Sequence, residues 1–385
     1  MTSPSIAVIG GGLAGLSLAL QLQAQPSFQG RLTILEARNA YTDDRRWSFW
    51  PVLAHPFSTL PLQRYPQLRV AARGREVLFD CSDMPYVCFA SGDLYAEAQR
   101  RLAGDPRFQL RMDTVVIGVD DGEAHAVVRT ANGQLRCDRV FDGRLPRLEP
   151  EFLQWFVGGE IELLPGAAMP LPVLMDFDVP RCDGDDREDA IVFGYALPQR
   201  GNTMLVQLTY FLPRGTRPPP DAWLRWQRYT DARLGLDSGR LMRAESGAIP
   251  MQPMRPVFDA GSRVQPFGAA AGWIRAATGY GFVDTQRACF RLAQALARAP
   301  YAPVEMRARA RVDDAMDAVL LEAMRRHPQR VGGWFLRLFE RCPSVRLIRF
   351  LSGIATAGDR LAVMAALPPQ PFLAAALGRR WRSGA

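Results

Sequence analysis

The glycine-rich segment near the start of the chain constrains its fold more than any other feature. The run Gly10–Gly15 fits the pattern G-x-G-x-x-G. It follows an apolar strand-like segment, Ile6–Ile9, and opens an apolar stretch that reaches about Gln23. Between a strand and a helix, the first glycine permits a tight turn, the second lets the backbone approach a pyrophosphate, and the third lets the helix pack on the strand. With a second strand pattern at Leu32–Leu35, the segment predicts a βαβ unit that binds a dinucleotide.

An acidic residue, Glu36, ends the second predicted strand, 21 residues after Gly15. At this position a carboxylate accepts hydrogen bonds from ribose hydroxyls and disfavours a 2′-phosphate. The unit also lies at the extreme N-terminus, which is typical of enzymes in which the adenosine half of FAD docks first. We therefore expect FAD, with NAD as the alternative. The predicted contacts to the adenosine half are Gly10, Gly12, Leu13, Ala14, Gly15 and Glu36.

The length of 385 residues suits two or three structural units. Alternating strand patterns with proline-rich joints occupy residues 155–250, and apolar positions at helical spacing occupy residues 305–377. We expect an α/β fold: a Rossmann-type FAD-binding domain with an inserted antiparallel β substrate domain and a helical C-terminal region. The expected bounds are 1–150 for the FAD domain, completed by about 255–300, then 151–254 for the inserted domain and 301–385 for the helical region.

The basic residues number 47 and all are arginine, so the chain has no lysine for Schiff-base or pyridoxal phosphate chemistry. The net charge is +8, and the arginines concentrate near the C-terminus without a recognised nucleic-acid motif, so we expect no nucleic-acid partner. The three histidines and six cysteines lack the spacing of metal ligands, and no CxxC pair occurs. We expect reduced thiols and no metal.

No apolar run reaches the ~18 residues of a transmembrane helix, and no basic segment precedes the first apolar stretch, which predicts a cytoplasmic protein. Residues 314–350 combine arginines with apolar positions, a composition typical of a helix lying on an anionic bilayer. A solvated arginine face on packed helices is the alternative. The apolar positions are Val319, Leu320, Trp334, Phe335, Leu338 and Phe339.

Small residues mark two further segments that could approach a flavin. Asp142-Gly143 ends a predicted strand, where it either holds the strand turn beside the cofactor or forms an ordinary turn. Phe267–Gly272 is rich in Gly and Ala, which let backbone N–H groups approach a pyrophosphate, and Thr278–Gly281 follows. We predict that Asp142, Gly268 and Gly279 lie nearer the flavin ring.

Several segments together resemble the bacterial lycopene cyclase family of flavoproteins, and the resemblance extends over nearly the whole chain. Each segment alone is modest evidence for the family, but their order along the chain is specific to it. They are Arg45–Trp50, Val140–Arg144, Phe156–Glu160, Leu174–Phe177, Glu245–Pro250, Phe267–Gly281, Arg349–Leu351, Asp359–Leu361 and Leu367-Pro368.

The resemblance implies a redox-neutral cyclisation that needs reduced FAD, with NAD(P)H as the reductant. A terminal double bond of a linear carotenoid such as lycopene is protonated, a neighbouring double bond attacks the cation, and loss of a proton leaves a β-ionone-type ring. Such a site must be apolar, hold one acid and shield the cation from water. The implied partners are a lipophilic carotenoid and the inner surface of a membrane.

One position departs from the family. Where the family carries a glutamate regarded as the acid, the segment Met204–Thr209 contains Gln207, which has no carboxyl proton to donate. Glu160 then becomes the preferred acid, although a structural glutamate is an equal alternative. Glu245 or the flavin itself are the other candidates, and Gln207 would contribute hydrogen bonding only.

Aromatic residues near these motifs either line a polyene tunnel or belong to the core. They are Trp47, Phe49, Trp50, Trp155 and Phe156. Two other functions stay open: an FAD-dependent oxidoreductase or monooxygenase on another polyene or aromatic substrate, and a flavin-bearing polyene carrier without activity. The first would consume NAD(P)H or oxygen in proportion to product, whereas the second would leave its pigment unchanged.

Overall fold

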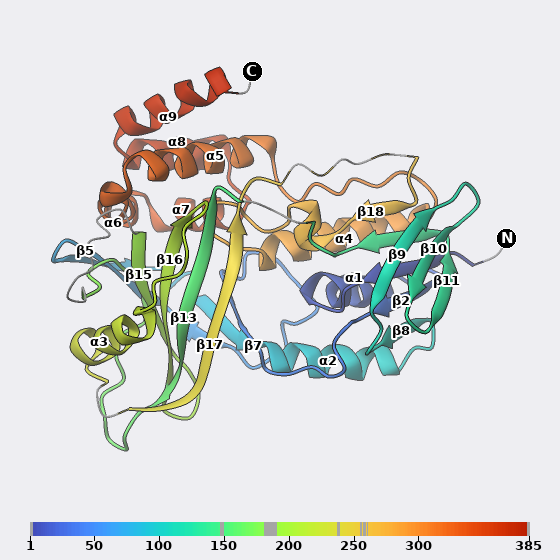
Figure 1. The fold of residues 1–385 in the computed structure, drawn as a ribbon, viewed down its shortest axis with the longest axis horizontal. Helices are drawn as coiled ribbons and strands as arrows, with labels where there is room; N and C mark the ends of the chain where they lie inside the picture. The colour runs from blue at the N-terminus through green and yellow to red at the C-terminus, as the bar shows by residue number, and fades with distance from the viewer. Residues whose placement is uncertain are drawn as a thin grey trace.

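A computed structural model describes residues 3–146, 150–180, 191–236, 239–254, 256, 259 and 261–382. The described chain forms two β-rich parts side by side, with helices of the C-terminal region along one side (Figure 1). One part is built on a parallel sheet and the other on a larger mixed sheet.

The parallel sheet has the strand order β18-β12-β1-β2-β8, and every neighbouring pair in it is parallel. From β1 the chain passes to β2 and β8 on one side and later returns to β12 and β18 on the other, so the strand order reverses at β1. Ligands of such sheets bind at this reversal, beyond the carboxyl ends of the strands. The strands are β1 (Ser5–Ile9), β2 (Arg31–Leu35), β8 (Phe108–Arg111), β12 (Arg139–Asp142) and β18 (Val264–Pro266).

Both faces of the parallel sheet are covered, because alternate residues of a strand point to opposite faces. Ile6 and Val8 pack against helices α1 (Leu13–Gln23), α2 (Ser91–Ala103) and α4 (Phe282–Arg298). Ala7 and Ile9 face a small antiparallel sheet. That sheet consists of β9 (Val116–Asp121), β10 (Ala126–Thr130) and β11 (Gly133–Cys137). This arrangement confirms the predicted Rossmann-type α/β fold.

The larger sheet has the order β17-β13-β16-β15-β14-β5-β6 and is antiparallel except for the parallel pair β14–β5. Its last two strands come from within residues 1–150, where we had not assigned them to this sheet. The sheet therefore combines the inserted segment with an N-terminal hairpin. Its strands are β5 (Gln67–Ala72), β6 (Arg75–Asp80), β13 (Phe152–Glu162), β14 (Val173–Asp176), β15 (Ile191–Pro198), β16 (Thr203–Pro213) and β17 (Arg240–Met251).

The two faces of this sheet have different neighbours. Helix α3 (Ala222–Leu234) covers one face, where Trp226 donates a hydrogen bond from Nε1 to the carbonyl of Val206 over 2.9 Å. The other face is turned to a small sheet formed by β3 (Arg46–Phe49), β7 (Tyr86–Ala90) and β4 (Gln63–Tyr65). Gln199, just after β15, bridges the two sheets by donating to Tyr65 Oη at 3.3 Å.

The C-terminal region is helical, as predicted, and consists of α5 (Arg311–Arg326), α6 (Val331–Arg341), α7 (Ser344–Leu351), α8 (Ala357–Ala366) and α9 (Pro369–Arg382). Trp334, Leu338 and Phe339, which we had considered for a bilayer-facing surface, are buried. Phe335 stacks on Phe177 of the β14 end with ring centroids 5.8 Å apart. These apolar residues of 314–350 therefore form a packing face, because the helices lie against the larger sheet.

Candidate functional site

The ends of three adjacent parallel strands bring the predicted cofactor residues together. The backbone N–H of Gly143 donates to the carbonyl of Ile9 over 3.0 Å, and that of Phe267 donates to the carbonyl of Asp142 over 2.9 Å. Gly268 lies so close to the start of α1 that a Cβ added to it would be 3.0 Å from Ala14 Cβ. Gly10–Gly15, Asp142 and Gly268 thus border one edge of the sheet.

The turn before α1 has the geometry of an anion-binding loop. Gly10 has a φ of +106°, which L-residues with a side chain rarely adopt. A Cβ added to Gly12 would meet no atom within 4 Å, whereas one added to Gly15 would lie 2.2 Å from the carbonyl oxygen of Gly10. Because α1 begins at Leu13 without a side-chain cap, the first-turn N–H groups, including that of Ala14, are available to an anion.

Glu36 lies beside this turn at the end of β2. Its carboxylate accepts hydrogen bonds from the N–H of Gly11 at 2.7 Å and from the guanidinium of Arg38 at 3.0 Å. Burial raises the pKa of Glu36, but the hydrogen bonds from Arg38 and Gly11 outweigh it and hold this pKa below its usual value. Glu36 is therefore an ionised acceptor. Arg38 and the stacked rings of Tyr41 and Tyr95 also border it, and the glycine pattern gave no signal for any of the three.

Gly279 contacts the larger sheet rather than the glycine turn. Its φ is +70°, and an added Cβ would lie 2.9 Å from Gln154 Oε1 on β13. That oxygen is buried and has no hydrogen-bond partner among the described residues. Helix α4 begins two residues after Tyr280 and has no side-chain cap at Gly281. An unpaired acceptor and free helical N–H groups thus lie on either side of Gly279. The sequence analysis had not singled out Gln154.

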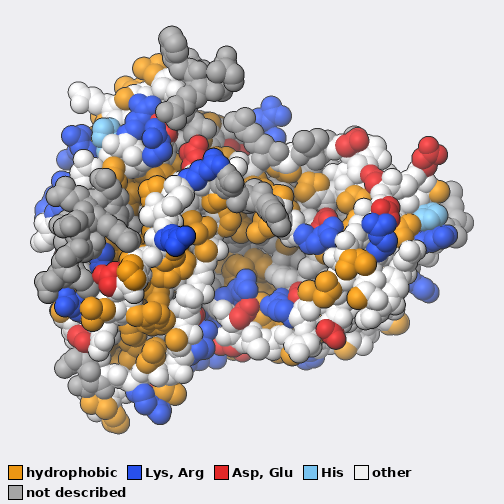
Figure 2. Space-filling model, in the orientation of Figure 1, with side chains coloured by type: hydrophobic (Ala, Val, Ile, Leu, Met, Phe, Trp, Pro, Cys, Tyr) orange, Lys and Arg blue, Asp and Glu red, His pale blue; other side chains and the backbone are white. Residues whose placement is uncertain are grey.

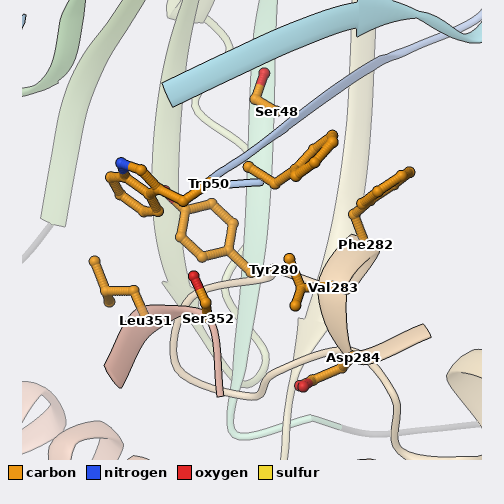
Figure 3. Close-up of a pocket in the computed structure, with 10 residues that line it drawn as sticks. Ser48, Trp50, Tyr280, Phe282, Val283, Asp284, Leu351 and Ser352 are labelled. Atoms are coloured by element: carbon orange, nitrogen blue, oxygen red, sulfur yellow. The ribbon is translucent and has the colours of Figure 1, made fainter. Parts of the chain in front are cut away.

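A pocket lies around the start of α4, between β3 and α7 (Figure 3). Trp50, Tyr280 and Leu351 point into the same space, with Ser48 and Ser352 at its borders. The hydroxyl of Tyr86 lies 3.3 Å from that of Tyr280, and burial raises the pKa of Tyr280 to about 12. The complete lining is Ser48, Phe49, Trp50, Tyr280, Gly281, Phe282, Val283, Asp284, Leu351 and Ser352.

The predicted tunnel aromatics fall into different places. Trp50 lines the pocket, whereas Phe49 also stacks on Phe282 with ring centroids 3.9 Å apart. Trp47 packs beside the core of the parallel-sheet part. Phe156 lies next to Gly247, but Trp155 contacts Tyr210 in the cluster under α3. Of the two alternatives, Trp155 therefore belongs to the core, because alternation along β13 turns it to the opposite face.

The register of three strands brings Gln207 and Glu245 together. Gly158 on β13 is the partner of Gln207 on β16 and also of Glu245 on β17. Because Gly158 has no side chain, the side-chain amide of Gln207 reaches over it and donates a hydrogen bond to the carboxylate of Glu245.

Glu160 joins the same cluster through two arginines. The carboxylate of Glu160 accepts from Arg46 on β3 and from Arg243 on β17, the latter at 3.2 Å. Arg243 also lies 3.1 Å from Glu245 Oε2. All three predicted catalytic residues therefore belong to one network with two arginines that we had not predicted. The signal for Arg243 was its spacing two residues before Glu245, on the same strand face, and Arg46 lies in the segment Arg45–Trp50 that resembles the family.

Gln154, which contacts Gly279, and the charged cluster lie on the same face of the larger sheet. Gly158 is four residues beyond Gln154 on β13, or ~13 Å along an extended strand. Figure 2 shows a hollow between the two parts of the molecule, with hydrophobic side chains inside and charged side chains at its border. A long apolar ligand along this face could reach the charged cluster from the cofactor edge.

Metal-binding and membrane-spanning features are a separate question for this site. They contain no group of three or more His, Cys, Asp or Glu side chains arranged to hold a metal ion. Within the described ranges no single helix is long and apolar enough to cross a membrane. Together, α8 and residues 369–378 of α9 do pass that length and composition test, as a pair bent by 113°.

Sequence comparison gives a match over nearly the whole length. The family described as Lycopene cyclase protein matches residues 5–377. A lycopene beta-cyclase of Pantoea ananas is 26% identical over 393 residues, covering 96% of this chain and 96% of that protein.

Three solved structures share the fold over nearly the whole chain. A flavoprotein/dehydrogenase from Cytophaga hutchinsonii has a TM-score of 0.62 at 10% identity, over 98% of this chain and 99% of that one. A geranylgeranyl bacteriochlorophyll reductase-like protein from Thermoplasma acidophilum has a TM-score of 0.56 at 13% identity, over 97% and 96%. A salicylate hydroxylase has a TM-score of 0.54 at 15% identity, over 95% of this chain and 99% of that one. These likenesses concern the fold.

Proposed function

Because the chain belongs to the lycopene cyclase protein family, we propose that it is a flavin-dependent cyclase that closes β-ionone-type rings on linear carotenoids such as lycopene. The proposed reaction is an isomerisation, with no net electron transfer. The observation that carries this proposal is the hydrogen bond between Gln207 and Glu245 across Gly158. It places the carboxylate of Glu245 next to Gln207, at the same register position of the sheet.

The residues at the sheet edge fit FAD. The open backbone at Gly12 and the uncapped start of α1 suit a pyrophosphate, and the ionised Glu36 suits a ribose. Gly268 and Gly279, with Gln154 as an unpaired acceptor, suit the flavin end. When bound in reduced form, the flavin supplies negative charge that stabilises a nearby cation. We propose NAD(P)H as its reductant.

Glu245 is our preferred acid, ahead of Glu160. Two guanidinium groups contact Glu160 and hold its carboxylate in place between β3 and β17. Glu245 shares only Arg243 with Glu160, and its other partner is the neutral amide of Gln207. A protonated Glu245 would give its proton to the terminal double bond, a carbon–carbon bond would close the ring, and the carboxylate would recover a proton from the ring.

The residues that line the pocket at the start of α4 would hold the end of the polyene and exclude water. Trp50 and Tyr280 offer aromatic faces, which stabilise a cation electrostatically. Because the proposed substrate dissolves in lipid, we also propose that the protein works in the cytoplasm, bound peripherally to the inner membrane surface.

The test is chromatography of pigments from lycopene-accumulating cells that express the wild type or Gln207→Glu. Cyclic carotenoids from the wild type are the expected result. Unchanged lycopene from the wild type, with rings from Gln207→Glu, would instead indicate a protein that kept the fold but has another natural substrate. Unchanged lycopene from both would contradict the proposed reaction.

A further inference from the structure

Helix α9 lies at the outside of the C-terminal region (Figure 1), and α8 precedes it in the chain. Each buries one face on its neighbours: α8 buries Val363 and Ala366, and α9 buries Ala375. Phe372 of α9 packs on Trp334, with ring centroids 5.0 Å apart. These inner contacts fix the orientation of both helices and so determine which side chains face outward.

The outward faces carry large apolar side chains. On α8, Leu361 is 62% exposed and Met364 is 50% exposed, and three positions of separation put them on the same helix face. On α9, Leu373 is 61% exposed and Leu377 is 63% exposed, four positions apart. Single exposed apolar residues are common, but four on two successive helices indicate a contact surface.

Arginines flank these faces and are held there by backbone carbonyls. Arg337 Nε donates to the carbonyl of Ala366 at 2.9 Å. A terminal nitrogen of Arg326 donates to the carbonyl of Ala374 at 3.2 Å, and its Nε pairs with Glu322 at 2.7 Å. Residues 301–385 contain fourteen arginines and seven acidic residues, so this region accounts for +7 of the net charge of +8. The apolar faces are thus part of the cationic region of the chain.

We propose that the outer faces of α8 and α9 seat the protein on an anionic lipid bilayer. Hydrocarbon would receive the four apolar side chains, while lipid phosphates would pair with the flanking arginines. Neither helix alone is long enough to span a bilayer. Because α8 packs on α7 and α9 packs on α5, we place both along the bilayer surface. The inference rests on the proposed function, which requires a substrate dissolved in lipid, and it replaces residues 314–350 as the contact segment.

The test compares binding to vesicles of pure phosphatidylcholine with binding to vesicles that also contain phosphatidylglycerol. The wild type is expected to sediment with the anionic vesicles and to be released by salt. Leu361→Ser/Leu373→Ser/Leu377→Ser should partition at least about tenfold less. The matched control is Ile117→Ser on β9, where the side chain is 66% exposed, and it should bind like the wild type. Unchanged thermal unfolding midpoints would show that the variants fold, and Leu373→Ser alone serves if the triple variant does not.

Equal vesicle binding by the triple variant and the wild type would overturn the inference. A wild type that binds neither vesicle would also overturn it, and so would a wild-type dimer that the triple variant converts to monomer, because a second copy would then cover these faces. Ring formation is measured separately on detergent-solubilised lycopene, where the triple variant should match the wild type. Vesicle binding without ring formation contradicts the proposed function alone, whereas ring formation without vesicle binding contradicts the membrane surface alone.

Discussion

The side-chain amide of Gln207 donates a hydrogen bond to the carboxylate of Glu245 over the bare backbone of Gly158. The three residues come from three adjacent strands. Gln207 and Glu245, on the two outer strands, could not touch if the middle strand carried a bulky side chain between them. This relationship places a carboxylate beside Gln207, the position at which we expect the acid of the family.

Glu245→Gln should lower ring formation by about 10²-fold or more, because removal of a general acid typically costs that much. Glu160→Gln should cost less than about tenfold, since we give Glu160 a positioning role between Arg46 and Arg243. Initial rates of cyclic carotenoid formation, measured on flavin-loaded enzyme, test both. A larger loss in Glu160→Gln than in Glu245→Gln would return the acid to Glu160.

Gly158→Ala should destabilise the fold and also separate Gln207 from Glu245. A Cβ at this position would lie 2.1 Å from the carbonyl oxygen of Val206, so the strand must shift. The expected loss of unfolding free energy is ~1–3 kcal/mol, as in overpacked cores. Gly333→Ala in α6 is the control, since its Cβ would meet Arg73 only at 3.6 Å. Denaturant unfolding that gives the same midpoint for both variants would refute the steric argument.

The cofactor edge was predictable because its residues are close in sequence. Gly10–Gly15 and Glu36 belong to one βαβ unit, and a local turn with a following helix fixes their positions. Asp142 followed from its place at the end of a predicted strand, and Gly268 from the small residues around it. The structure brings both to the same edge, because adjacent parallel strands end there. The prediction of the cofactor residues therefore rested mostly on local sequence patterns and turn geometry.

The charged cluster was predictable only in part. The resemblance had nominated Glu160, Gln207 and Glu245 one by one, but their contacts depend on strand register, which a single sequence does not determine. Arg46 reaches Glu160 from 114 positions away, and no local pattern reports such a pairing. The exposed faces of α8 and α9 were missed for a similar reason, because tertiary packing decides which apolar helix faces are covered.

Gly12→Ala and Gly15→Ala should separate cofactor binding from folding. A Cβ on Gly12 meets no protein atom within 4 Å, so the variant should fold normally, but the methyl group would fill space that a pyrophosphate needs. We expect FAD affinity, measured by flavin fluorescence, to fall about tenfold or more. A Cβ on Gly15 would clash with Gly10, so Gly15→Ala should lower the thermal unfolding midpoint of the flavin-free protein itself. Unimpaired FAD binding by Gly12→Ala would contradict the assignment of this turn.

The stability of the protein should depend on pH through His55. Burial lowers the pKa of His55 from 6.5 to about 4, where its ring lies against Phe49 and Phe282. Between these two values the unfolded chain binds a proton at this residue and the folded chain does not. The stabilisation is therefore complete above pH 6.5 and is lost progressively as the pH falls toward 4.

His55→Gln tests this dependence, because glutamine keeps a polar side chain but does not titrate. The difference in unfolding free energy between wild type and variant, from denaturant titrations at a series of pH values, should be constant above pH 6.5. Below pH 6.5 the wild type should lose unfolding free energy relative to the variant, down to about pH 4. Carboxyl groups titrate in both proteins, so the comparison cancels them. A difference that stays flat from pH 7 to pH 4 would mean that the folded protein tolerates a protonated His55, and that the ring is solvated there.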